Sequence, residues 1–104
     1  MRFPITIYKE DPEQTRLAEW HEVCYAFDAT ARSFVLLDKH GWWENAKGQA
    51  HFNVQVLYEP QKSEGEANTA MDARVQWLVQ EGWTHKFTTE LDLSTGRLVP
   101  IRIP

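Results

Sequence analysis

Residues 13–32 read EQTRLAEWHEVCYAFDATAR, and the conformation of this stretch decides which fold the chain adopts. Its apolar side chains recur at steps of three and four residues, the spacing of one helix face, and no glycine or proline interrupts it. These side chains are Leu17, Trp20, Cys24, Phe27 and Ala31. Val23, Tyr25 and Phe27 also alternate, so residues 22–27 could instead form a strand. We favour the helix.

The residues before this stretch indicate where the helix begins. Asp11 is a good N-cap, Pro12 suits the first helical position, and Gln14 can close a capping box. We therefore expect the helix to start at Pro12.

Alternating apolar residues predict one strand before this helix and two strands after it. Phe3, Ile5 and Ile7 alternate with less apolar neighbours, which is typical of a strand with one buried face. Residues 33–38 contain a short apolar run that can continue through the following tryptophans, and residues 52–58 alternate again. Turn-forming residues lie between the last two segments, so we expect these to pair as a hairpin.

A second helix is predicted after a polar loop at residues 61–66. Its apolar stripe consists of Ala70, Met71, Val75 and Leu78. Trp77 widens the stripe, and Gly82 stands where a left-handed residue commonly ends a helix. This segment is therefore expected to pack one face on the sheet, with Trp77 in the core.

A terminal hairpin completes the predicted order of elements. Residues 87–93 and 98–103 alternate on either side of a Ser-Thr-Gly turn, and Pro100 marks an edge of the sheet. The order is then strand, helix, strand, strand, helix, strand, strand. We predict an α+β two-layer sandwich, a ferredoxin-like variant in which two helices cover one face of an antiparallel sheet of about five strands.

Length and charge predict one domain, residues 1–104, without nucleic-acid or membrane partners. The net charge is −4, and the basic residues are scattered singly. Residues 47–54 have the spacing of an RNA-stacking strand, but Gln49, His51 and Val54 stand where aromatic rings are needed. No apolar run is long enough for a signal peptide or a membrane span, so we expect a cytoplasmic protein.

One pair of residues has a spacing that suits metal binding. His21 and Cys24 are three apart and would share a face of the predicted helix. Structural zinc sites usually contain two such pairs, and Cys24 lies on the apolar stripe, so a buried thiol is the better interpretation. We predict no metal ion and no cofactor, and we assign no catalytic residue.

The adjacent pair Trp42 and Trp43 is the best candidate for a functional site among the five tryptophans. Neighbouring residues of a strand face opposite sides of a sheet, so both rings can enter one core only if a bulge at Gly41 turns them. The polar and aromatic residues expected near the pair are His40, Glu44, His51 and Tyr25.

Two functions fit this tryptophan pair. The first is a non-enzymatic interaction module that forms a homodimer and buries the outward ring in the sheet surface that the helices leave uncovered. The alternative is a small-molecule binder or small enzyme, with an aromatic pocket near Trp42 and Trp43 for an apolar or aromatic ligand. We prefer the first.

Overall fold

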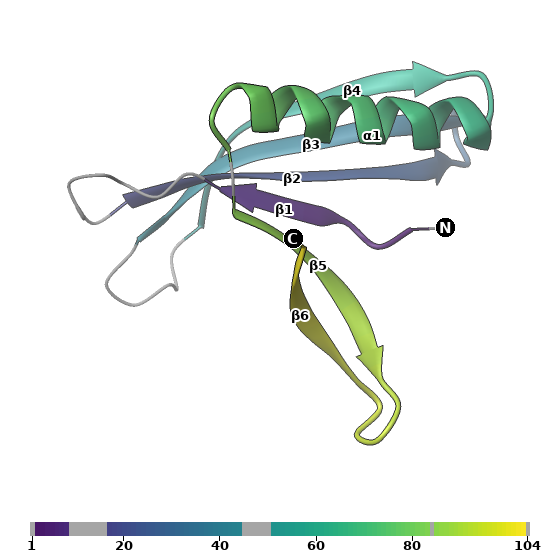
Figure 1. The fold of residues 1–104 in the computed structure, drawn as a ribbon. Coiled ribbons are helices and arrows are strands. Elements are labelled where there is room, and N and C mark those ends of the chain that lie inside the picture. Colours follow the sequence, from purple (N-terminus) through teal and green to yellow (C-terminus); the bar gives the residue numbers. More distant parts are fainter. Residues whose placement is uncertain (1, 9–16, 45–50, 84, 104) are drawn as a thin grey trace.

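The computed structural model of the chain describes residues 2–8, 17–44, 51–83 and 85–103. These residues form six strands and one helix (Figure 1). The elements are β1 (Ile5–Tyr8), β2 (Leu17–Asp28), β3 (Ser33–Glu44), β4 (His51–Gln61), α1 (Glu64–Gln80), β5 (His85–Asp92) and β6 (Arg97–Ile103). All strands belong to one antiparallel sheet in the order β4-β3-β2-β1-β5-β6.

The predicted ferredoxin-like sandwich with two helices and about five strands is wrong. A 12-residue strand, β2, occupies most of the stretch that was expected to be the first helix. It pairs with β1 on one side and with β3 on the other. The predicted helix start at Pro12 lies outside the described residues. The alternative interpretation of residues 22–27 as a strand is the correct one.

Alternation wins over helical spacing in β2 because the strand has a neighbour on each side. Val23 and Tyr25 are buried in the core under α1, and His21 is buried next to them in the same alternating series. Glu22 and Cys24 belong to the opposite face of the sheet. Side-chain packing on a paired, half-buried strand thus overrides the propensity of the isolated segment.

The turn after β2 contains neither glycine nor proline. Asp28 forms it instead, since its Oδ1 accepts hydrogen bonds from the backbone N–H of Thr30 at 2.9 Å and of Ala31 at 3.1 Å. Arg32 adopts a left-handed conformation with φ of 53°. The aspartate side chain thus reverses the chain without glycine or proline, which is why the helical pattern seemed uninterrupted.

The other predicted elements are present, with shifted boundaries. β3 pairs with β4, β5 pairs with β6, and Gly82 after α1 is left-handed with φ of 97°. The helix begins at Glu64, inside the predicted loop, because the Ser63 side chain accepts a hydrogen bond from the N–H of Glu66 at 3.1 Å. The β3–β4 ladder also has a register shift between His40 and Gly41, at the position of the bulge considered as the alternative arrangement of the tryptophan pair.

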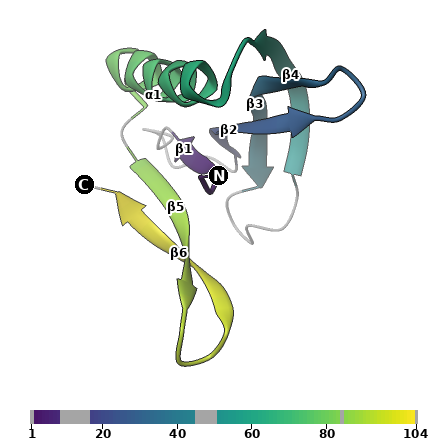
Figure 2. The same ribbon diagram turned by 90° about the vertical axis from the view of Figure 1, so that its right-hand side faces the viewer.

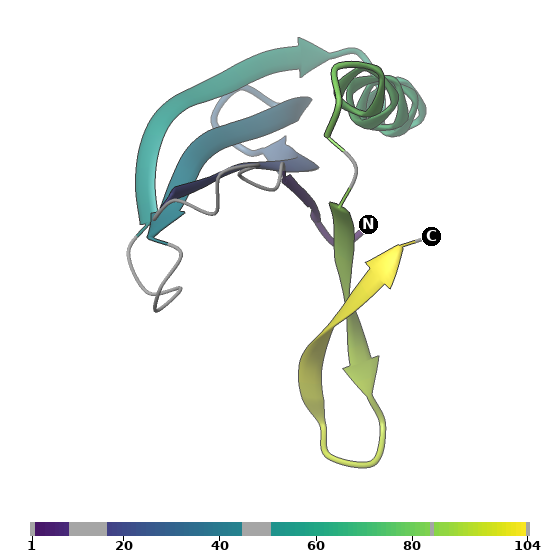
Figure 3. The same cartoon turned by 60° about the vertical axis from the view of Figure 1, so that its left-hand side comes forward.

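The helix covers only part of one sheet face. Ala67, Met71 and Leu78 of α1 are buried against β1, β2 and β3, and Trp83 closes the core beyond the helix end. The β5–β6 hairpin projects away from α1 (Figure 2), and Figure 3 shows the strong curvature of β3 and β4 on the other side. Within the described ranges, α1 is too short and too polar to cross a membrane.

Candidate functional site

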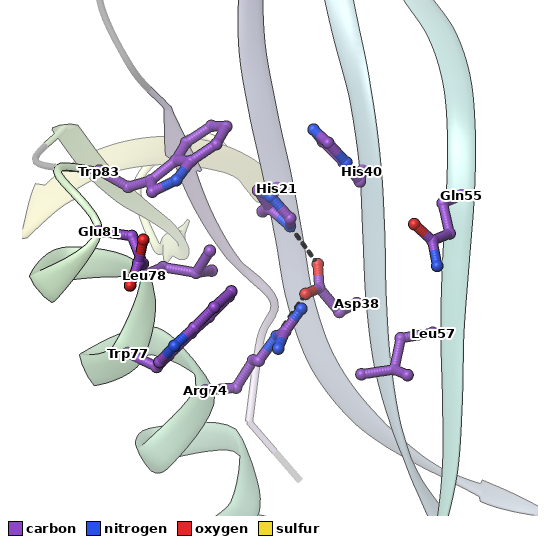
Figure 4. A pocket seen from close by; sticks show the side chains of 10 residues that line it. All are labelled: His21, Asp38, His40, Gln55, Leu57, Arg74, Trp77, Leu78, Glu81 and Trp83. Atoms are coloured by element: carbon purple, nitrogen blue, oxygen red, sulfur yellow. Dashed lines mark hydrogen bonds and ion pairs between the residues drawn. The ribbon is translucent and has the colours of Figure 1, made fainter.

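A cavity of about 340 Å³ lies between the C-terminal half of α1 and strands β2, β3 and β4 (Figure 4). Its walls combine charged, aromatic and aliphatic side chains. The sheet contributes His21, Asp38, His40, Gln55 and Leu57. The helix and the residues after it contribute Arg74, Trp77, Leu78, Glu81 and Trp83. A concave space with a few convergent polar groups is typical of a small-molecule site.

Asp38 is the central charged group of the cavity wall. Its side chain is only 1% exposed, because β3 directs it to the face that α1 covers. Oδ1 lies 2.6 Å from Nδ1 of His21, and Oδ2 accepts a hydrogen bond from Nε of Arg74 at 2.6 Å. Burial alone would raise the pKa of this carboxyl, but the hydrogen bonds and positive charge of His21 and Arg74 outweigh it, so its pKa lies below the ordinary value. Asp38 is therefore a buried carboxylate anion.

His21 is oriented by this carboxylate. An ionised carboxyl group can only accept, so Nδ1 of His21 carries a proton and donates it to Asp38. The edge of Trp83 fixes the ring from another side, with centroids 4.6 Å apart and planes at 88°. Nε2 makes no hydrogen bond within the part of the chain that the structure describes. The Asp38 contact thus leaves Nε2 as the available nitrogen of a ring that lines the cavity.

A second imidazole stacks on the first. His40 lies opposite His21 in the β2–β3 ladder, and the two rings are parallel within 8° at a centroid distance of 4.2 Å. Nε2 of His40 is 2.5 Å from Oε1 of Glu19. Each histidine of the stack therefore has its own carboxylate, which balances charge if either ring is protonated.

Arg74 brings a guanidinium group to the same wall from α1. The group lies 4.4 Å from the centre of the Trp77 ring, and its Nε is used by Asp38. Its Nη groups have no hydrogen-bond partner among the residues that the structure describes. Cation–π stacking and the Asp38 hydrogen bond together hold the guanidinium plane in place. Four N–H bonds of a fixed, planar cation thus remain for another acceptor.

The sequence-predicted site residues are only partly brought together. His40 lines the cavity, whereas Tyr25 is buried in the core and donates a hydrogen bond to Glu64 Oε1 at 3.2 Å. The backbones of Trp43 and His51 are opposite each other in the β3–β4 ladder. The structure does not describe the side chains of Trp42, Trp43, Glu44 and His51. Which tryptophan faces outward therefore stays a prediction.

Sequence reasoning missed the central residues of the cavity. Asp38 follows the apolar run Phe34 to Leu37, at a position that alternation places on the same face as Leu36. A charged residue at an inward position of a buried strand was the available signal. Trp77, predicted in the core, is instead 45% exposed and stacks on Arg74, while the predicted packing of Trp83 at the helix end is confirmed.

The pairing of His21 with Cys24 does not exist in the fold. On a strand, residues three apart point to opposite faces, so the thiol lies away from the cavity. Burial and the nearby Glu22 raise the pKa of Cys24, which disfavours its reactive thiolate form. Among the described residues, no group of three or more metal-ligating side chains is placed to hold a metal ion.

Comparison with known proteins assigns no family to the chain. No family model, no curated protein and no solved structure matches it. The chemistry of the cavity is therefore what points to a function.

Proposed function

We propose that this protein binds a small organic molecule in the cavity between α1 and strands β2, β3 and β4. One observation carries the proposal: the buried Asp38 carboxylate holds His21 and Arg74 in fixed orientations at the cavity wall, and each of these keeps polar groups available. Aromatic surface from Trp77 and Trp83 adjoins them. This combination of ordered polar groups and aromatic surface is what orients a small ligand.

The energetic cost of the arrangement supports a functional role. Removing a carboxylate and its partners from water costs several kcal/mol per ion, and well-packed apolar side chains often serve stability as well or better. Asp38 nevertheless stands in the core-facing side of β3, next to the buried Leu36. Buried charged groups that lower the stability of the folded state are typical of binding and catalytic sites.

Adjacent residues on β4 provide a matched test of cavity binding. Leu57 lines the cavity, whereas Val56 belongs to the opposite face and is 53% exposed. The Leu57→Trp substitution fills the cavity and should abolish binding, while Val56→Trp adds the same ring outside it. Saturation-transfer NMR with benzoate, benzamide and benzylamine measures the effect. If no probe gives a signal that Leu57→Trp removes and Val56→Trp retains, the proposal fails.

Self-association through the uncovered sheet face is a second candidate function. Val56 and Tyr58 of β4 are exposed on the face away from α1. A second copy of the chain packed there as a homodimer would cover this surface. Sedimentation at micromolar concentration should give a dimeric mass that Val56→Asp reduces toward that of a monomer. A monomeric wild-type chain contradicts this function.

A further inference from the structure

We propose that the cavity is selective for a monocarboxylate, which forms a two-point contact with the Arg74 guanidinium and accepts a further hydrogen bond from His21. This inference rests on the proposed ligand-binding function and specifies its ligand class. It depends on which hydrogen-bonding groups remain available at the wall and on the balance of charge there.

Arg74 supplies the geometry that a carboxylate requires. Its Nε is bound to Asp38, and its plane is held over Trp77, so the Nη groups form the available part of a rigid fork. Planar guanidinium groups bind carboxylates through two parallel N–H···O hydrogen bonds, which a lysine ammonium cannot reproduce. Because the fork is already ordered, little side-chain entropy is lost when the ligand binds.

His21 supplies the second contact. Its Nδ1 donates to Asp38, so its Nε2 becomes a donor when the ring carries a second proton. The titratable and charged groups around this ring are Asp38 and His40 from β3, Arg74 from α1, and Glu81 at the helix C-cap. His40 is already paired with Glu19, and Glu81 is exposed to water. Asp38 is thus the buried carboxylate nearest to this ring, at 2.6 Å from its Nδ1.

The balance of charge favours a single negative charge on the ligand. When His21 carries a second proton, Arg74 and His21 hold two positive charges, and Asp38 neutralises one of them. A monocarboxylate neutralises the other. The second negative charge of a phosphate monoester would lie near Asp38 and Glu81 without a cation of its own, since the remaining imidazole is held by Glu19.

The size of the cavity admits a ring that bears such a group. A volume of about 340 Å³ lies within the range of about 300–1,000 Å³ that is typical of small-molecule sites. A molecule of the size of benzoate fits this volume. Its carboxylate would meet Arg74 and His21, and its ring would meet the apolar part of the lining formed by Leu57, Leu78 and Trp83.

Three probes that share one ring test the ligand class on the wild-type chain. Isothermal titration with benzoate, benzamide and phenyl phosphate compares one negative charge, no charge and up to two charges on similar shapes. We expect benzoate to bind at least ten-fold more tightly than either of the others. Equal affinity for benzamide, or a preference for phenyl phosphate, overturns the carboxylate proposal and leaves cavity binding standing. If none of the three binds but benzylamine does, the carboxylate proposal alone is overturned. If benzylamine gives no signal either, the proposed function itself fails.

A conservative substitution tests the role of the guanidinium fork. Arg74→Lys keeps the charge and removes the two-point contact, so benzoate affinity should fall ten-fold or more while benzamide affinity changes less than two-fold. The matched control is Arg97→Lys on the exposed β5–β6 hairpin, which should change neither. An unchanged benzoate affinity in a folded Arg74→Lys chain overturns the proposal. Because the probe comparison uses only the wild-type chain, the test does not depend on the folding of this variant.

Discussion

Two aspartate–arginine pairs involve the same helix at the same distance, yet they lie in different environments. Arg74 of α1 contacts Asp38 at 2.6 Å in the cavity wall, and Asp72 of α1 contacts Arg2 at 2.6 Å on the surface. The side chain of Asp38 is 1% exposed, whereas that of Asp72 is 59% exposed. The difference teaches that burial, more than contact distance, decides what such a pair does. The first pair orders a cavity, and the second is a solvated contact.

The largest expected effect comes from removing each carboxylate in turn. Asp38→Asn removes the buried negative charge that Arg74 and His21 contact. The free energy of unfolding should therefore fall by about 3–5 kcal/mol. Asp72→Asn should reduce it by less than about 1 kcal/mol, because water screens and solvates the surface pair. Urea denaturation of both variants measures the difference. Equal costs for the two substitutions would show that burial does not separate the pairs.

Replacing both partners of the buried pair should reverse part of that loss. The double variant Asp38→Leu with Arg74→Met leaves no unpaired charge of the pair, but it also leaves the buried Nδ1–H of His21 without its acceptor. Its stability should therefore exceed that of Asp38→Asn and remain about 1–3 kcal/mol below wild type. Benzoate binding should nevertheless disappear. Denaturation and titration of the same sample separate the two effects. A double variant as unstable as Asp38→Asn would mean that the pair is required for folding.

Acidification should lower the free energy of unfolding by protonating the buried Asp38 carboxylate. The pKa of Asp38 is lower in the folded chain than its ordinary value, so its contribution to stability is complete above the ordinary carboxyl pKa of about 3.9 and is lost as the pH falls through the lower, folded-state pKa. The unfolding free energy of wild type should therefore decrease between about pH 5 and pH 2 more steeply than that of the double variant Asp38→Leu with Arg74→Met. Parallel pH profiles would rule out this role of Asp38.

The fold could be predicted from the sequence wherever a local signal agreed with the tertiary arrangement. Both hairpins and the helix that ends before Gly82 have turn residues or a glycine at their ends, and these elements are confirmed. The apolar residues of the β2 stretch fit both the spacing of a helix face and the alternation of a strand. Only pairing with the neighbouring strands β1 and β3 decides between these two patterns. Asp28 formed a turn through side-chain hydrogen bonds that composition alone does not indicate.

The candidate site was less predictable than the fold because its residues come from distant parts of the sequence. His21, Asp38 and Arg74 meet only after β2 has paired with β3 and α1 has crossed the sheet. Had residues 22–27 been taken as a strand, alternation would have placed His21 with Val23 and Tyr25 on the buried face. The position of Arg74 over this face depends on the rotation of the helix, which sequence spacing left open.

Added salt should weaken the coupling energy of the surface pair more than that of the buried pair, and this is the smallest of the expected effects. Raising sodium chloride from about 0.1 M to 1 M shortens the screening length from about 10 Å to about 3 Å, which weakens charges in water far more than buried ones. A double-mutant cycle on Arg2 and Asp72 should give a coupling energy of roughly 0.2–1 kcal/mol at low salt and none at high salt. The same cycle on Arg74 and Asp38 should keep most of its coupling energy, because water and ions do not reach a carboxylate that is 1% exposed. If both couplings fell in parallel, ions would have access to Asp38 in solution, which would contradict the burial of this carboxylate in the structure.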